Sequence, residues 1–304
     1  MNSLLISNEE IHLSELKEKQ IRLFIKREDT IHPFVSGNKY RKLKYNLIEA
    51  KNQGHARLLT FGGAYSNHIA ATAYAGKKAG FKTIGVIRGE ELKNTWQNNP
   101  TLKQAHRQGM QFHFVSREAY RNKNHIDFLT GLEKNFGPFY LIPEGGTNDL
   151  AVKGCEEILT KTDAIFDVIC CCVGTGGTIS GLINSARPNQ MVLGFPALKG
   201  DFLKQDILKF ARNDNWKLKS NYHFGGYAKV DKPLIQFINT FKSTTGIPLD
   251  PIYTGKMMFG ILDLIQKNFF KQGYQILAIH SGGLQGIQGM NLALKRKNLP
   301  ELDI

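Results

Sequence analysis

The stretch FDVICCCVGTGGTISGL, residues 166–182, joins an apolar run of the strand type to a glycine-rich turn and then to a helical pattern. An apolar run without polar alternation is typical of a strand that is buried on both faces of a parallel sheet. The order of strand, turn and helix therefore predicts an α/β protein, with this turn at the carboxyl end of a strand.

Runs of the same strand type recur along the chain and alternate with amphipathic stretches. This alternation predicts open, twisted parallel sheets with helices on both faces. A length of 304 residues favours two domains. We expect a small α/β domain from 43 to 138 and a large one made of 1–42 and 139–304. The further strand-type runs are ARLLTFGG (56–63), KTIGVIRG (82–89), MQFHFVSR (110–117), FYLIPEGG (139–146), QMVLGFPAL (190–198) and YQILAIHSGG (274–283).

The chain is basic, with 40 Lys and Arg residues against 26 Asp and Glu and a net charge of +14. The lysines are spread along the chain, with no basic tail and no RNA-binding motif, so we expect no nucleic-acid partner. An anionic substrate or cofactor accounts for the charge instead. The first residues do not form a signal peptide, and no apolar run reaches membrane length. The sequence therefore predicts a cytoplasmic protein without a membrane partner.

The four cysteines predict core packing and not cross-linking. Cys170, Cys171 and Cys172 are consecutive in an apolar run, and Cys155 stands alone in a helical pattern. No CxxC spacing of the metal-binding type occurs, so we expect neither a disulfide framework nor a metal site.

The glycine-rich turn at 174–178 predicts an anion site, because such a turn exposes successive backbone N–H groups at the start of a helix. The alternative is a tight turn that needs glycine dihedral angles and binds nothing. The third glycine of the dinucleotide fingerprint falls on Ile179, which disfavours a dinucleotide. A single phosphate fits this turn better. Its members are Gly174, Thr175, Gly176, Gly177 and Thr178.

A helix is predicted over NKYRKLKYNLIEAKNQG, residues 38–54, with an apolar face and a glycine stop. The apolar face holds Tyr40, Leu43, Leu47 and Ala50. Lys39, Lys42 and Lys44 crowd its first turns, either as a solvated basic face or because one lysine does chemistry. A reactive amine together with a monophosphate cradle describes a site for pyridoxal 5'-phosphate (PLP), which attaches to a lysine.

Four segments in the same order resemble the family of 1-aminocyclopropane-1-carboxylate (ACC) deaminases and D-cysteine desulfhydrases. These are PLP enzymes with the fold of the tryptophan synthase β-subunit, called fold type II. The similarity spans about residues 20 to 290. The segments are FIKREDTIHPFVSGNKYRKLKY (24–45), TFGGAYSNHIAATAYAGKKAG (60–80), VGTGGTISGL (173–182) and DPIYTGKMMFGI (250–261).

The resemblance implies roles for residues at the matching positions. Lys39 would hold PLP and Lys42 would support the phosphate, whereas Lys44 would be a solvated helix residue. Ser66 would act near the substrate carboxylate, and Asn67 would lie beside the phenolic oxygen of PLP. The other implied site residues are His68, Tyr227 and Tyr253 for the substrate and Gly174, Thr175, Gly176, Gly177 and Thr178 for the phosphate.

Two positions distinguish the activities in this family. The first position follows the tyrosine of the PxYxGK motif, and the second lies between the histidine and the paired glycines of the HxGG motif. Deaminases carry glutamate at the first and leucine at the second, whereas desulfhydrases carry small hydroxyl residues at both. This chain has Thr254 and Ser281. A neutral hydroxyl near the pyridine nitrogen does not hold it protonated as a carboxylate would, so the ring is a weaker electron sink. This suits β-elimination better than opening of a cyclopropane ring.

The sequence thus predicts elimination on a small D-amino acid, with D-cysteine giving pyruvate, sulfide and ammonia. Lys39 would remove the Cα proton, and Tyr253 would assist the leaving group. Tyr65 and Ala278 depart from the family pattern, which leaves other β-substituted substrates open. The alternatives are an ACC deaminase that gives 2-oxobutyrate and ammonia, and a PLP-binding protein without turnover. The resemblance also implies a homodimer.

Overall fold

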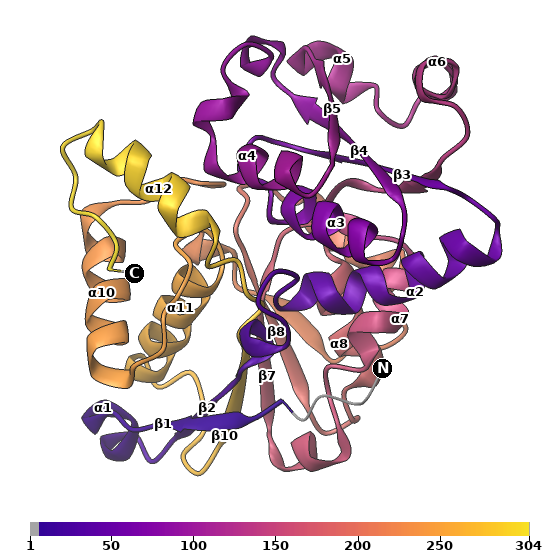
Figure 1. Ribbon diagram of the computed structural model, residues 1–304. Helices are drawn as coiled ribbons and strands as arrows, with labels where there is room; N and C mark the ends of the chain where they lie inside the picture. The colour runs from indigo at the N-terminus through magenta and orange to yellow at the C-terminus, as the bar shows by residue number, and fades with distance from the viewer. Residues whose placement is uncertain (1–5, 304) are drawn as a thin grey trace.

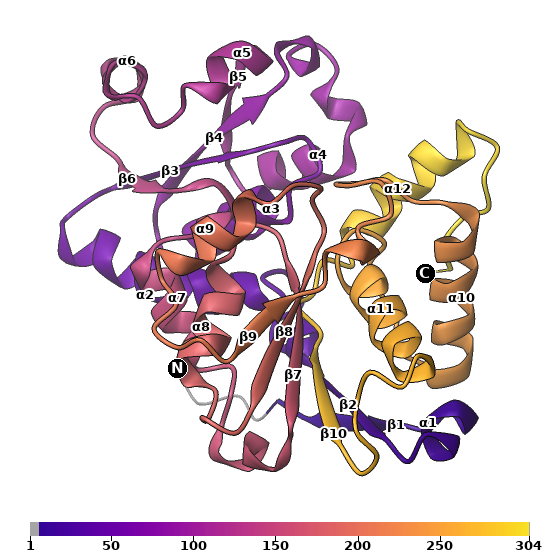
Figure 2. The same ribbon diagram turned by 180° about the vertical axis from the view of Figure 1, so that it is seen from behind.

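The computed structural model describes residues 6–303 and contains two sheets, each flanked by helices (Figures 1 and 2). The larger sheet has the strand order β1-β2-β10-β7-β8-β9, and only β1 runs antiparallel to its neighbour. These strands are β1 (Asn8–Ile11), β2 (Arg22–Lys26), β7 (Val168–Val173), β8 (Met191–Pro196), β9 (Trp216–Leu218) and β10 (Gln275–Ile279).

Helices cover both faces of the larger sheet, which explains the uninterrupted apolar run of β7. Cys170 and Cys172 pack on the side of α10 and α11, whereas Ile169, Cys171 and Val173 pack on the side of α7 and α8. Figure 2 shows the two helix layers on either side of the strands. The helices are α1 (Ser14–Glu18), α7 (Asp149–Glu156), α8 (Gly177–Ser185), α9 (Phe202–Leu208), α10 (Lys232–Thr245), α11 (Thr254–Gln266) and α12 (Gly286–Lys295).

The smaller sheet is wholly parallel, with the order β5-β4-β3-β6. Its edge strand β6 pairs with β3 and lies just beyond residue 138, the expected end of the small domain. We propose that the small unit extends to residue 142. Its elements are β3 (Arg57–Gly62), β4 (Lys82–Arg88), β5 (Gln111–Val115) and β6 (Tyr140–Ile142), with α3 (Asn67–Lys78), α4 (Pro100–Arg107), α5 (Arg117–Arg121) and α6 (Ile126–Phe136).

The seven strand-type runs of the sequence are all strands in the structure, which confirms the predicted α/β fold with open parallel sheets. The pattern missed β1, β2 and β9. Two of these, β1 and β9, are the edge strands of the larger sheet and are short. Edge strands need less apolar sequence because one side faces no neighbour.

Helix α2 (Asn38–Asn52) confirms the predicted period and connects the two sheets. Leu43 and Ala50 are buried against the small sheet in one apolar cluster. Lys44 differs from the expectation of a solvated residue, because it is half-buried and forms an ion pair with Glu157 at 2.7 Å. Within residues 6–303, no helix is long and apolar enough to span a membrane.

Candidate active site

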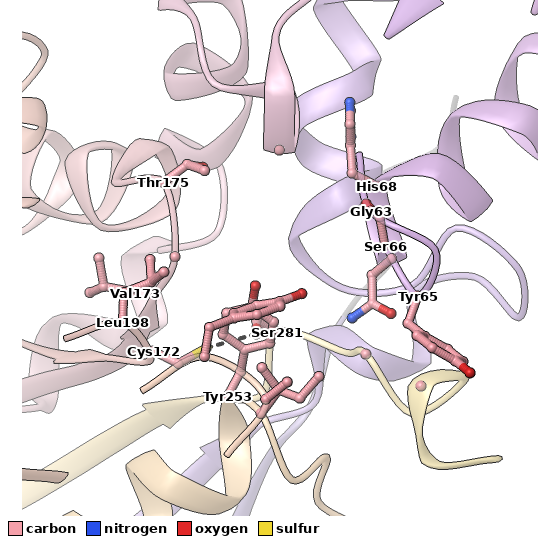
Figure 3. Close-up of a pocket in the computed structure, with 18 of the residues that line it drawn as sticks. Gly63, Tyr65, Ser66, His68, Cys172, Val173, Thr175, Leu198, Tyr253 and Ser281 are labelled. Carbon is pink, nitrogen blue, oxygen red and sulfur yellow. Dashed lines mark hydrogen bonds between the residues drawn. The ribbon is translucent and has the colours of Figure 1, made fainter. Parts of the chain in front are cut away.

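A cavity of about 800 Å³ opens where the carboxyl ends of strands from both sheets converge (Figure 3). The residues that follow β3, β6, β7 and β10 line it, together with the first turn of α2. This is where ligands bind in open α/β proteins, and the volume lies in the range of small-molecule sites, about 300–1,000 Å³.

Lys39 enters the cavity from the first turn of α2, and Gly37 fixes how that helix begins. Gly37 has a φ of +61°, and a Cβ atom there would lie 1.9 Å from the carbonyl oxygen of Ser281. That carbonyl accepts a hydrogen bond from the Asn38 N–H. The Lys39 amine donates to Asn38 Oδ1 at 3.1 Å, and burial lowers its pKa below the ordinary value. The lowered pKa favours the neutral, nucleophilic form of the Lys39 amine.

The glycine-rich turn forms the predicted anion cradle at the start of α8. Gly176 has a φ of +84°, so the chain turns there in a conformation that favours glycine. The first N–H group of the helix that is hydrogen-bonded is that of Ser180, which donates to Gly176 O. Within residues 6–303, the N–H groups of 176–179 have no hydrogen-bond partner, so four donors remain for an anion.

Lys42 supplies an independent test of whether a phosphate fits here. Its side chain is only 2% exposed, and its amine donates to Gly145 O, Thr147 Oγ1 and Thr175 Oγ1 at 3.0, 2.9 and 3.4 Å. No carboxylate in the described part of the chain pairs with it. Burial and then the charge of Lys39 lower its pKa to about 7. The Lys42 amine is buried and has no acidic partner, and it lies beside the unpaired N–H groups of the turn. This combination of donors fits a phosphate group.

Ser66 and Asn67 lie at the start of α3, on the side of the cavity that belongs to the small sheet. Ser66 caps the helix by accepting from the Ile69 N–H at 3.3 Å, which explains why a hydroxyl residue stands there. Both residues line the cavity. The start of this helix thus presents backbone N–H groups to the cavity, an arrangement that suits an anionic group.

His68 has a buried ring whose polar edges face away from Ser66 (Figure 3). Its Nε2 lies 2.8 Å from Thr60 Oγ1, and that hydroxyl donates to Ile142 O, so Nε2 carries the proton. Burial, and next the charges of Lys39 and Lys42, lower its pKa well below the ordinary value. His68 is therefore a neutral, buried ring that forms part of the cavity wall.

Tyr253 and Tyr227 form an aromatic pair on the opposite wall, with ring centroids 6.2 Å apart in an edge-to-face arrangement. A Cβ atom on Gly174 would lie 3.4 Å from the Tyr253 hydroxyl oxygen, which places this hydroxyl beside the anion cradle. Burial, and next the proximity of Tyr227, raise the pKa of Tyr253 well above its ordinary value. The hydroxyl therefore stays protonated and can donate a hydrogen bond.

Thr254 is the predicted site residue that the structure does not bring to the cavity. It is fully buried, and its hydroxyl donates to Asp250 Oδ2 at 2.7 Å and accepts from the Asp250 N–H. Of the two hydroxyl residues, Ser281 lines the cavity, whereas Thr254 is turned to Asp250.

The other predicted residues line the cavity, except Gly177, where a Cβ atom would lie 3.2 Å from the amine of Lys42. Sequence reasoning missed Glu144 and Thr147. Glu144 lies at the end of the strand-type run 139–146 and Thr147 follows it, so both come just after the carboxyl end of a strand, where ligands bind in open α/β sheets. Sequence reasoning also missed Cys172, which lines the cavity. The run of three cysteines that ends with Cys172 is typical of core packing, and no sequence motif distinguishes Cys172 from the other two.

Comparisons with known proteins agree with this site. Residues 5–282 match the family model described as pyridoxal-phosphate dependent enzyme. A protein of Thermotoga maritima named putative ACC deaminase is 32% identical over 299 residues, which cover 90% of this chain and 93% of that protein. A protein of Arabidopsis thaliana named bifunctional D-cysteine desulfhydrase/ACC deaminase, mitochondrial, is 31% identical over 295 residues, which cover 87% and 73%.

A solved structure described as an ACC deaminase homologue superposes with a TM-score of 0.81 at 26% identity, covering 96% of this chain and 94% of that one. The fold and the cavity thus define a PLP-dependent enzyme of fold type II. Within that class, the chain belongs to the family of ACC deaminases and D-cysteine desulfhydrases.

Proposed function

We propose that this enzyme catalyses β-elimination on a small D-amino acid, with D-cysteine and water giving pyruvate, hydrogen sulfide and ammonia. The observation that carries this proposal is the uncharged hydroxyl of Ser281 in the cavity lining, whose side-chain hydrogen-bond partner within residues 6–303 is the thiol of Cys172 and not a carboxylate. A neutral partner leaves the cofactor ring a moderate electron sink, which is sufficient when a thiolate leaves from Cβ.

PLP, when bound, withdraws electrons from the Cα of an attached amino acid and so acidifies its Cα–H bond. Lys42 and the N–H groups of the turn at 174–178 would hold the phosphate, and Lys39 would form the covalent attachment. Lys39 then serves as the general base for the Cα proton, because its lowered pKa keeps a larger fraction of the amine neutral.

The remaining residues bind the substrate and protonate the leaving group. Ser66, Asn67 and the start of α3 would bind the α-carboxylate. Tyr253, whose raised pKa keeps its hydroxyl protonated, would give its proton to the departing sulfur. Tyr227 packs edge-to-face against Tyr253 and would limit the space beside Cβ.

A second candidate function is ACC deamination, which gives 2-oxobutyrate and ammonia. The names of the relatives favour it, because several are called putative ACC deaminases. Within residues 6–303 the Ser281 hydroxyl is hydrogen-bonded to a thiol and not to a carboxylate, which argues against it, since ring opening needs a stronger electron sink. A PLP-binding protein without turnover is the remaining alternative, and the presence of Lys39 in the cavity argues against it.

The test is to supply D-cysteine, L-cysteine and ACC separately to the PLP-loaded enzyme and to measure sulfide, pyruvate and 2-oxobutyrate. We expect sulfide and pyruvate from D-cysteine in equal amounts and no 2-oxobutyrate. Release of 2-oxobutyrate from ACC at a higher kcat/KM would establish the second candidate. No product from any of the three would favour the non-catalytic alternative or a different substrate.

Lys39→Ala should lose the visible absorption band of lysine-bound PLP and lower kcat by about 10²- to 10⁴-fold, the usual contribution of a general base. Lys44→Ala is the matched control on the same helix, because it removes the ion pair with Glu157 outside the cavity. It should keep both the band and the rate. We also propose a homodimer, which light scattering of the holoenzyme tests directly.

A further inference from the structure

The thiol of Cys172 lies 3.0 Å from the hydroxyl of Ser281, and both side chains line the cavity (Figure 3). The two residues come from neighbouring parallel strands. β10 and β7 are paired with Ala278 opposite Cys170, so Cys172 and Ser281 meet at the same carboxyl edge. They are only 6% and 8% exposed, so water does not compete for this contact.

The direction of this hydrogen bond follows from the chemistry of the two groups. Burial raises the pKa of the Cys172 thiol to about 12, so the sulfur carries its proton at neutral pH. By geometry either group could donate in this contact. With the thiol protonated and the hydroxyl oxygen the better acceptor, one arrangement has the S–H of Cys172 donating to Ser281 Oγ, and it leaves the O–H of Ser281 uncommitted.

The Ser281 side chain has no other hydrogen-bond partner within residues 6–303. Its proton is then directed away from the sulfur and into the cavity. We propose that Cys172 is a positioning residue, whose S–H bond to Ser281 Oγ holds the serine hydroxyl as a hydrogen-bond donor toward the cofactor.

A hydroxyl held as a donor selects a ligand atom with a free lone pair, such as an unprotonated aromatic nitrogen, and disfavours a protonated one. Three acidic residues lie near this pair in the described part of the chain. Glu144 and Asp206 line the cavity and are engaged with Lys123 at 3.3 Å and Lys209 at 2.6 Å. Asp250 acts on Cys172 through its charge but does not line the cavity, and its carboxylate accepts the N–H groups of residues 252–254 and the Thr254 hydroxyl. Cys172 thereby helps to keep the cofactor ring uncharged.

The experiment is a double-mutant cycle on the dissociation constant of PLP, measured by titrating the apoenzyme and following cofactor absorbance. Cys172→Ala should weaken PLP binding on the order of 2- to 10-fold, the usual effect of one buried hydrogen bond. The same change in a Ser281→Ala background should have no further effect, because Cys172 acts through Ser281. This readout needs no substrate, so it is independent of the proposed reaction.

Cys170→Ala is the matched control, since Cys170 lies on the same face of the same strand, is fully buried and does not line the cavity. It should lower thermal stability and leave the PLP dissociation constant unchanged. Cys172→Ser keeps a donor and should restore part of the affinity lost in Cys172→Ala. If Cys172→Ala does not fold, the comparison of Cys172→Ser with the wild type is the test.

Two results would overturn the proposal. One is an equal loss of PLP affinity from Cys172→Ala in both backgrounds, which would mean that the cysteine packs the site without acting on Ser281. The other is unchanged affinity in both Cys172→Ala and Cys172→Ser.

Discussion

Thr254 and Asp250 satisfy each other's polar groups at the start of α11. The Thr254 hydroxyl accepts from the Asp250 N–H at 2.8 Å and donates to Asp250 Oδ2 at 2.7 Å. The same carboxylate accepts the N–H groups of Ile252, Tyr253 and Thr254. This network fixes the backbone that carries Tyr253 into the cavity. The residue that the sequence assigned to the cofactor thus supports the neighbouring tyrosine.

Thr254→Val should lower the free energy of unfolding by about 1–3 kcal/mol, because it leaves buried groups of Asp250 without a partner. Urea unfolding of the apoenzyme measures this. Thr254→Ser keeps the hydroxyl and is the control, with a loss of less than about 1 kcal/mol expected. If Thr254→Val instead shifted the absorption maximum of bound PLP without a change in stability, the hydroxyl would reach the cofactor after all.

Lys42→Met should have opposite effects on stability and on cofactor binding. Methionine removes a buried amine that has no acid partner, so the apoenzyme should be as stable as the wild type or more so at pH 7. PLP should bind at least about 10-fold more weakly, because the phosphate loses its buried cation. Equal PLP affinity in both proteins would remove Lys42 from the phosphate site.

The stability of the apoenzyme should also depend on pH through Lys42. Its pKa is about 7 in the folded chain against an ordinary value of 10.5, so between these values the unfolded chain binds more protons. The free energy of unfolding should therefore rise with pH across this window, by at most about 1.4 kcal/mol per pH unit for this group. The difference between wild type and Lys42→Met isolates the effect, and a flat difference from pH 7 to 9 contradicts it.

Tyr253→Phe should lower kcat for D-cysteine by about 10²- to 10⁴-fold if its hydroxyl protonates the leaving sulfur. Affinity for PLP should change little, because the ring still packs against Tyr227. Tyr227→Phe is the matched control and should retain most of kcat. A substrate with a better leaving group, such as β-chloro-D-alanine, should be less sensitive to Tyr253→Phe. Equal sensitivity would argue that Tyr253 positions the substrate.

Lys256→Met should release the loop that carries Tyr227. The Lys256 amine is buried and donates to His223 O and Gly226 O at 2.9 and 2.8 Å, and this loop contains Ala228 with a φ of +55°. Loss of both bonds should raise KM for D-cysteine more than it lowers kcat, since Tyr227 only shapes the substrate space. A selective loss of kcat with unchanged KM would place Lys256 in the chemistry.

The sequence alone determined the fold class, because apolar strands that alternate with amphipathic helices have few ways to bury their surfaces. It also indicated Lys39 and the turn at 174–178, since helix starts and glycine turns have local signatures. Local patterns sufficed for these features because their geometry depends on neighbours within a few residues.

Tertiary structure decided which side chains face the cofactor and which support them. Thr254 turns its hydroxyl to Asp250, and Cys172 reaches the cavity although its run is typical of a core strand. The exposure of Cys172 to the cavity depends on contacts between segments that are distant in sequence. The direction of the Thr254 hydroxyl depends on how the start of α11 is oriented. Burial then made Lys42 an amine with a pKa of about 7, because desolvation depends on the whole surrounding structure.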